Sequence, residues 1–123
     1  MKAARLFSLL GSVALVVSAI FHTSGYPNLL HLMQTSATPQ PLDGILRAAW
    51  LLLSVQFLVT AGITMFARIM ARGGAIVFLC AVYSGLTGIL LWRFMGIFAG
   101  VYLLAVVTMF LLMGAWLQMK HSV

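Results

Sequence analysis

The sequence predicts an all-α membrane protein, a polytopic bundle of four transmembrane helices with both termini in the cytoplasm. Three observations predict it: the composition, four long apolar runs, and the distribution of basic residues. Of 123 residues, 63% are hydrophobic and 7% are charged, and the mean hydropathy is +1.14. A soluble domain carries roughly 25% charged residues. The composition therefore excludes a soluble globule, a disordered chain and a disulfide-rich secreted module.

Four apolar runs supply the expected spanning segments, at about 6–21, 44–66, 74–92 and 97–117. Each approaches the ~20 residues that a helix needs to cross the hydrocarbon core. A spanning segment without a partner sheet must satisfy its own backbone groups, so each run is expected to be a helix. None of the runs alternates polar and apolar residues as a membrane barrel strand does. The whole chain, 1–123, is expected to form one four-helix membrane domain.

The first run has a second interpretation. Lys2 and Arg5 precede it, and Val17-Ser18-Ala19 resembles a signal-peptide cleavage site. The apolar stretch is long for the core of a signal peptide, so we favour an uncleaved helix.

The basic residues predict the orientation. One expected side of the bundle carries Lys2, Arg5, Arg68, Arg72 and Lys120, and the other carries only Arg47 and Arg93. The positive-inside rule then places both termini in the cytoplasm, in what we expect to be a bacterial inner membrane. The basic residues are too dispersed for a soluble basic face, so no nucleic-acid partner is expected. The single acidic residue, Asp43, argues against a proton-coupled transporter, which commonly uses an intramembrane acid.

The segment from about 22 to 43 is expected to be an external loop. Its Ser/Thr/Pro stretch at 35–41 cannot continue a helix. Residues 28–33 are apolar enough to form a short helix on the membrane surface. Pro41 and Asp43 are typical of a helix start, where Asp43 would cap free N–H groups and pair with Arg47 four residues later.

Several residues with binding chemistry are expected at this outer rim. They are His22, Tyr26, Asp43, Arg47, Trp50 and Arg93. In one interpretation they are anchors, with arginines reaching the headgroups and Trp50 and Trp92 in the aromatic belt. In the other, the rim holds the phosphate or quinone carbonyl of an amphiphile whose tail lies between the helices. No cofactor other than such a lipid or quinone is expected.

A second set of polar residues is expected near the middle of the membrane: Ser12, Gln56, Tyr83 and Thr108. An unpaired amide in hydrocarbon is costly, so Gln56 is expected to face a partner inside the bundle. Its role could be a structural hydrogen bond or the floor of a ligand cavity. Small residues four apart (Ala81 and Gly85, Ser84 and Gly88, Gly96 and Gly100) favour close helix packing, within the chain or in a homo-oligomer.

Metal and catalytic motifs are weak in this sequence. His22 and His31 are nine residues apart and no ligand set with metal spacing emerges, so no metal site is expected. Cys80, the single cysteine, lies in an apolar run and is expected to be a small buried hydrophobe. His22 with Asp43 could act as acid and base near the outer surface, although no motif specifies a substrate.

Two short stretches carry a family resemblance. A histidine follows the first run in the stretch from Leu9-Leu10-Gly11 through Phe21-His22, and an arginine opens the second run in Leu46-Arg47-Ala48. This half of the chain resembles the small four-helix DoxX-like membrane proteins. The resemblance implies a four-helix membrane fold and, for some members, association with quinone-linked or redox membrane complexes. The second run here lacks the acidic residue that DoxX-type proteins tend to carry.

The leading functional hypothesis is a small, non-enzymatic integral membrane protein. It would hold a lipid or quinone-like amphiphile at the outer rim, or act as an accessory subunit of a larger membrane complex. Two alternatives stay open. The first is an oligomeric transporter or channel for small solutes, with polar residues along a continuous path through Gln56 and Tyr83. The second is a membrane enzyme with a lipophilic substrate.

Overall fold

The computed structural model describes residues 2–121, which form five helices and no strand. The helices are α1 (Lys2–Ser24), α2 (Tyr26–Thr35), α3 (Gln40–Ala67), α4 (Gly74–Met95) and α5 (Ala99–Lys120). The prediction of an all-α helical bundle is confirmed.

Four helical stretches are long and apolar enough to cross a membrane, which matches the predicted number of spans. They cover Lys2–Thr35, Gln40–Ala67, Gly74–Met95 and Ala99–Lys120. At about 1.5 Å per residue, the 22 residues of α4 or α5 span about 33 Å, close to the ~30 Å of a hydrocarbon core. The 28 residues of α3 span about 42 Å, so α3 is longer than a bilayer core requires.

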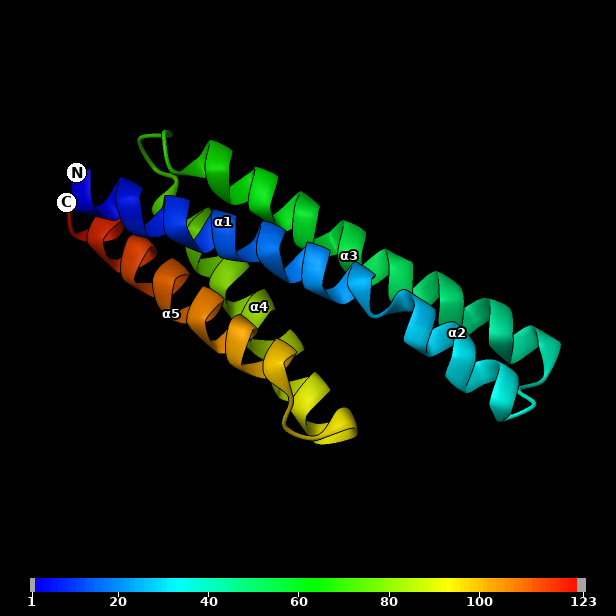
Figure 1. Cartoon of the computed structure of the whole chain (residues 1–123). Helices are drawn as coiled ribbons and strands as arrows, with labels where there is room; N and C mark the ends of the chain where they lie inside the picture. The colour runs from blue at the N-terminus through cyan, green and yellow to red at the C-terminus, as the bar shows by residue number, and fades with distance from the viewer. Residues whose placement is uncertain (1, 122–123) are drawn as a thin grey trace.

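The bundle has two chemically different ends (Figure 1). The start of α1, the end of α5 and the link between α3 and α4 lie together at one end, here called the terminal end. The link between α4 and α5 lies at the opposite end, here called the rim end, and α2 with the first turns of α3 projects beyond it. Arg68 follows α3 and Arg93 lies in the last turn of α4, so these arginines lie at opposite ends of the bundle. Which end faces the cytoplasm stays a prediction.

The segment expected as an external loop at 22–43 is mostly helical. α1 runs to Ser24, α2 follows after Gly25, and α3 begins at Gln40, which leaves a link of only 36–39. The chain breaks between α1 and α2 because Pro27 has no N–H for the Thr23 carbonyl and its ring crowds that carbonyl. After this break α2 continues in nearly the direction of α1 and packs along α3 (Figure 1). It therefore extends the first helical hairpin.

Helix α1 lies at the centre of the bundle and packs against both α3 and α5. One face of it buries small side chains at helical spacing: Ala4, Ser8, Gly11, Ser12, Leu15, Ser18 and Ala19. The hydroxyls of Ser12 and Ser18 donate to carbonyls one turn earlier on α1, at 2.9 and 2.8 Å. Small residues let neighbouring helix backbones approach closely where lipid provides no hydrophobic drive.

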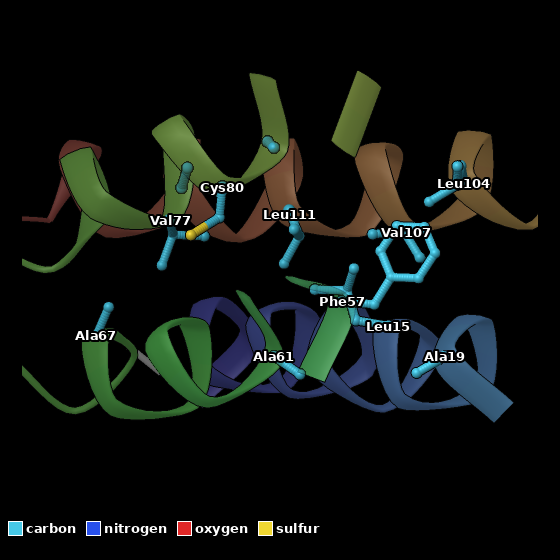
Figure 2. Packing of buried hydrophobic residues seen from close by; sticks show 12 residues of the cluster. Leu15, Ala19, Phe57, Ala61, Ala67, Val77, Cys80, Leu104, Val107 and Leu111 are labelled. Atoms are coloured by element: carbon cyan, nitrogen blue, oxygen red, sulfur yellow. The ribbon is translucent and has the colours of Figure 1, made fainter. Parts of the chain in front are cut away.

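The apolar core lies between the α1–α3 pair and the α4–α5 pair, as Figure 2 shows. Leu15, Val77, Val107 and Leu111 are fully buried there, and Phe57 is 2% exposed. Cys80 belongs to this cluster, so the prediction that it is a small buried hydrophobe is confirmed. The outward faces carry many exposed large hydrophobic side chains, as expected of surfaces that the bilayer covers.

The small residues of α4 pack against α5 within the same chain. A Cβ added to Gly85 would lie 3.3 Å from Thr108 Cγ2, and one added to Gly88 would lie 3.4 Å from Leu104 Cβ. Gly96 has a different role, because it ends α4 with φ of +80° and ψ of −169° and an added Cβ would meet nothing within 4 Å. That backbone conformation is essentially restricted to glycine. The spacing of Gly96 and Gly100 is therefore not a packing motif.

Candidate functional site

At the rim end, His22 on α1 and Trp50 on α3 make a reciprocal contact. The Trp50 indole N–H donates to the His22 carbonyl oxygen at 2.9 Å, and His22 Nε2 donates to the Trp50 carbonyl oxygen at 3.1 Å. The two rings stack with centroids 4.1 Å apart and planes at 17°. The edge of Phe57 also meets the His22 ring, at a centroid distance of 6.1 Å.

Neighbouring residues build this contact into the helix pair. The Thr23 hydroxyl lies 2.8 Å from the Ala19 carbonyl oxygen and 3.0 Å from Ser54 Oγ, which adds a polar bridge between α1 and α3. A Cβ added to Gly25 would lie 3.0 Å from the Trp50 ring, so the glycine makes room for the indole. The indole N–H of Trp50 is therefore hydrogen-bonded within the protein. In a tryptophan of the aromatic belt, the ring lies at the level of the headgroups.

The hydrogen bonds define what His22 can do chemically. Its Nε2 faces a carbonyl, which only accepts, so Nε2 carries the proton and the Nδ1 of the neutral ring is an acceptor. His22 lines a small cavity of about 20 Å³ with Ser18, Leu91 and Phe98, enough for about one water molecule. A neutral His22 can therefore accept a hydrogen bond from water or a hydroxyl, and has no free N–H for a quinone carbonyl.

Asp43 and Arg47 form the ion pair expected from their spacing on α3. Arg47 Nε lies 3.0 Å from Asp43 Oδ1 and Nη2 lies 2.9 Å from Oδ2, so the contact is bidentate. Arg47 also interacts electrostatically with Tyr26. Asp43 does not cap α3 through its side chain, because the helix begins earlier, after Pro39. The positive charge of Arg47 is therefore already balanced within the protein.

Arg93 lies at the rim end but apart from these residues. Its guanidinium carbon lies 5.9 Å from the centroid of the Phe94 ring. Within residues 2–121 no ion pair or hydrogen bond joins Arg93 to Arg47, Tyr26 or His22. The structure thus brings His22 together with Trp50, and Arg47 together with Asp43 and Tyr26, and leaves Arg93 as a separate cation.

The mid-membrane polar residues satisfy their hydrogen bonds locally. The Tyr83 hydroxyl donates to Gln56 Oε1 at 2.8 Å and joins α3 to α4, on the outer side of the bundle where Gln56 is exposed. The expectation that Gln56 faces the bundle interior is therefore wrong, because Tyr83 reaches it from outside. Ser12 and Thr108 bond to carbonyls on their own helices, at 2.9 and 2.8 Å. These contacts lie on separate faces and make no continuous polar path in the described chain.

Two apolar grooves open onto the lipid-facing surface, each with a volume of about 300 Å³. The groove between α4 and α5 is lined by Gly85, Gly88, Ile89, Trp92, Val101, Leu104, Ala105 and Thr108. The other lies between α1 and α3, and Ser12 is one of its lining residues. From the sequence, Gly85 and Gly88 are expected only to pack helices together. Their missing side chains also hollow the α4–α5 surface, which small-residue spacing could have indicated.

Residues 2–121 contain no group of side chains arranged for acid–base catalysis or for metal binding. His22 is bonded to Trp50 and Asp43 to Arg47, so the acid–base pair considered from the sequence does not form. No group of three or more His, Cys, Asp or Glu residues that could hold a metal ion occurs in this range.

Comparisons of the chain with protein-family models, with curated proteins and with solved structures find no match. The resemblance to DoxX-like proteins therefore stays a prediction from the sequence.

Proposed function

We propose that this integral membrane protein binds a lipid or quinone-like amphiphile, with the tail in the α4–α5 groove and the headgroup at Arg93. One observation carries the proposal: Trp92 is among the residues that line an open apolar groove of about 300 Å³, and Arg93, the next residue along α4, has no carboxylate partner among residues 2–121. An acyl or isoprenoid tail matches the apolar lining. A phosphate or carbonyl oxygen matches the guanidinium of Arg93.

The rim residues are not equally suited to bind the headgroup in this proposal. Arg47 is bidentately paired with Asp43, so binding an anion there would require competition with an existing ion pair. His22 in its neutral form has no free N–H for a carbonyl, whereas it can accept a hydrogen bond from a hydroxyl. The headgroup contact is therefore assigned to Arg93, and His22 with Trp50 is assigned a structural role.

The alternatives receive less support from the geometry. A channel needs polar side chains along a path, whereas Gln56 and Tyr83 bond to each other on an outer face. An enzyme using His22 with Asp43 needs the two groups together, and each is bonded elsewhere. An accessory-subunit role stays a prediction, since either lipid or a partner subunit can cover the exposed apolar faces.

Replacing Ala105 by phenylalanine is expected to remove most of the amphiphile that co-purifies with the protein. Ala105 is exposed and lines the α4–α5 groove, so the ring would fill the groove without entering the core. The measurement is extraction and quantification of lipids and quinones per mole of protein by mass spectrometry, after purification in a mild detergent. Arg93→Gln is expected to lower retention according to headgroup, most for anionic species.

Met109→Phe is the matched control. Met109 lies one turn further along α5, is 71% exposed and lies outside the groove. The proposal fails if Ala105→Phe retains the wild-type amount of every amphiphile, or if Met109→Phe loses as much.

A further inference from the structure

A second cavity lies at the terminal end, far from the groove and the rim. Its volume is about 480 Å³, within the range of roughly 300–1,000 Å³ common for ligand pockets. The start of α1, the α3–α4 link and the last turns of α5 form its walls. The side chains that give it its chemistry are Arg5, Arg68, Arg72, Gln118 and His121. From the sequence, these arginines are expected only to orient the chain in the membrane.

The charge of this cavity is strongly positive. Three guanidinium groups and a histidine line it, and the only acidic residue of the chain, Asp43, is paired with Arg47 at the other end of the bundle. No carboxylate side chain of residues 2–121 can therefore balance these arginines. The first turn of α1 adds the positive end of a helix dipole beside Arg5.

Arg68 is held in place at this cavity by its backbone. Its N–H donates to the Thr64 carbonyl at 3.0 Å, and its carbonyl accepts from Gln118 Nε2 on α5 at 2.9 Å. Its side-chain Nε is buried and has no hydrogen-bond partner in the part of the chain that the structure describes. A buried charged donor without an acceptor is unfavourable, and an oxyanion in the cavity would supply the acceptor.

The α3–α4 link that carries Arg68 and Arg72 is an ordered turn. Backbone N–H groups of Ile69, Met70 and Gly73 donate to carbonyls three residues earlier, at 3.2, 3.1 and 3.3 Å. A Cβ at Gly73 would overlap the backbone of Ala67, so only glycine permits this tight fold. Arg68 and Arg72 therefore line the cavity from a hydrogen-bonded backbone turn.

We propose that this cavity binds a phosphate-bearing anion, either the headgroup of an anionic phospholipid or free phosphate. Arginine forks match phosphate oxygens bidentately, and Arg68 Nε is the buried donor that such an oxygen would satisfy. Apolar wall residues such as Ile69, Met70 and Leu117 provide contact for the glycerol and upper acyl chain of a lipid. Basic pockets at membrane-protein ends suit anionic headgroups in this way.

The test measures binding to the full-length protein with two probes. In a neutral detergent, native mass spectrometry follows bound phosphatidylglycerol against phosphatidylcholine, and a thermal-shift titration follows inorganic phosphate. We expect saturable binding of phosphatidylglycerol, of phosphate, or of both, and little preference for phosphatidylcholine. Arg68→Gln is expected to weaken that binding about tenfold, as loss of a charge-assisted hydrogen bond implies. Arg68→Lys keeps the positive charge but loses the two parallel donors of the guanidinium. Its affinity is expected to lie between those of the wild type and Arg68→Gln.

Arg72→Gln is the second variant, because Arg72 is exposed and its loss should not disturb folding. Lys120→Gln is the matched control, because Lys120 is exposed at the same end of the bundle, loses the same charge and does not line the cavity. Saturation by phosphatidylglycerol alone identifies a lipid headgroup, and saturation by phosphate alone identifies the free anion. The proposal is overturned if neither probe saturates, or if Lys120→Gln weakens binding as much as Arg68→Gln and Arg72→Gln.

Discussion

Replacing Gly114 by leucine is expected to lower the free energy of unfolding by about 3 kcal/mol, at the upper end of typical overpacking costs. Gly114 is buried on α5 against α1, and an added Cβ would lie 2.9 Å from the backbone nitrogen of Ser8. Because that neighbour is backbone, it cannot move aside as a flexible side chain would. The two helices would have to separate, which would open the core around Leu15 and Leu111.

The measurement is the free energy of unfolding in mixed micelles titrated with a denaturing detergent. Gly62→Leu is the matched control, since a Cβ there would meet nothing within 4 Å. Gly62→Leu should be neutral or stabilising, because glycine costs a helix interior about 1 kcal/mol relative to better helix formers. Equal stability of the Gly114 and Gly62 variants would contradict the close packing of α1 on α5.

Replacing Trp50 by alanine is expected to lower the free energy of unfolding by about 2 kcal/mol, the second large effect. The stacked contact with His22 contributes about 1 kcal/mol, and the indole hydrogen bond to the His22 carbonyl contributes about 1 kcal/mol more. The reverse bond from His22 ends on the Trp50 backbone and can persist in the variant. Trp50→Phe should keep part of the ring packing and lose about 1 kcal/mol.

Trp92→Ala is the control for this pair, because Trp92 is 54% exposed on α4. Its stability should stay close to that of the wild type in the same unfolding measurement. If Trp50→Ala were as stable as Trp92→Ala, Trp50 would be an aromatic-belt residue and the α1–α3 contact would need another explanation.

The positions of the spans could be predicted from the sequence, but the helix ends could not. Hydropathy locates the part of a helix inside hydrocarbon, whereas α1 and α3 continue through polar residues at their ends. Helix α3 begins at Gln40, before the apolar run at about 44, and α1 already begins at Lys2. Pro27 breaks the helix only briefly, so the segment expected as a loop contains the end of α1, all of α2 and the start of α3.

The types of residue at the candidate site could be predicted from the sequence. Most of the contacts between them could not. The Asp43–Arg47 pair depends only on helical spacing, and the structure contains it. The His22–Trp50 contact joins residues 28 positions apart and depends on the register of the α1–α3 hairpin, which the sequence does not specify. Gln56 was expected to point inward because hydrocarbon penalises an unpaired amide. Tyr83 satisfies it equally well from the outer side.

The terminal cavity was missed for a related reason. Arg5 is distant in sequence from Arg68 and Arg72, and only the packing of α1, α3 and α5 brings all three around one cavity. A usable signal was present in the sequence: a chain with one acidic residue cannot neutralise several arginines that share one end of a bundle.

The most direct test of the four-span bundle is the accessibility of its two ends from opposite sides of the membrane. Arg72→Cys and Arg93→Cys, each combined with Cys80→Ala, would be labelled with a membrane-impermeant maleimide in intact cells and again after permeabilisation. Both positions are exposed in the structure, and Cys80 is buried. We expect Arg93→Cys to react in intact cells and Arg72→Cys to react only after permeabilisation. Reaction of both positions from the same side would contradict the account.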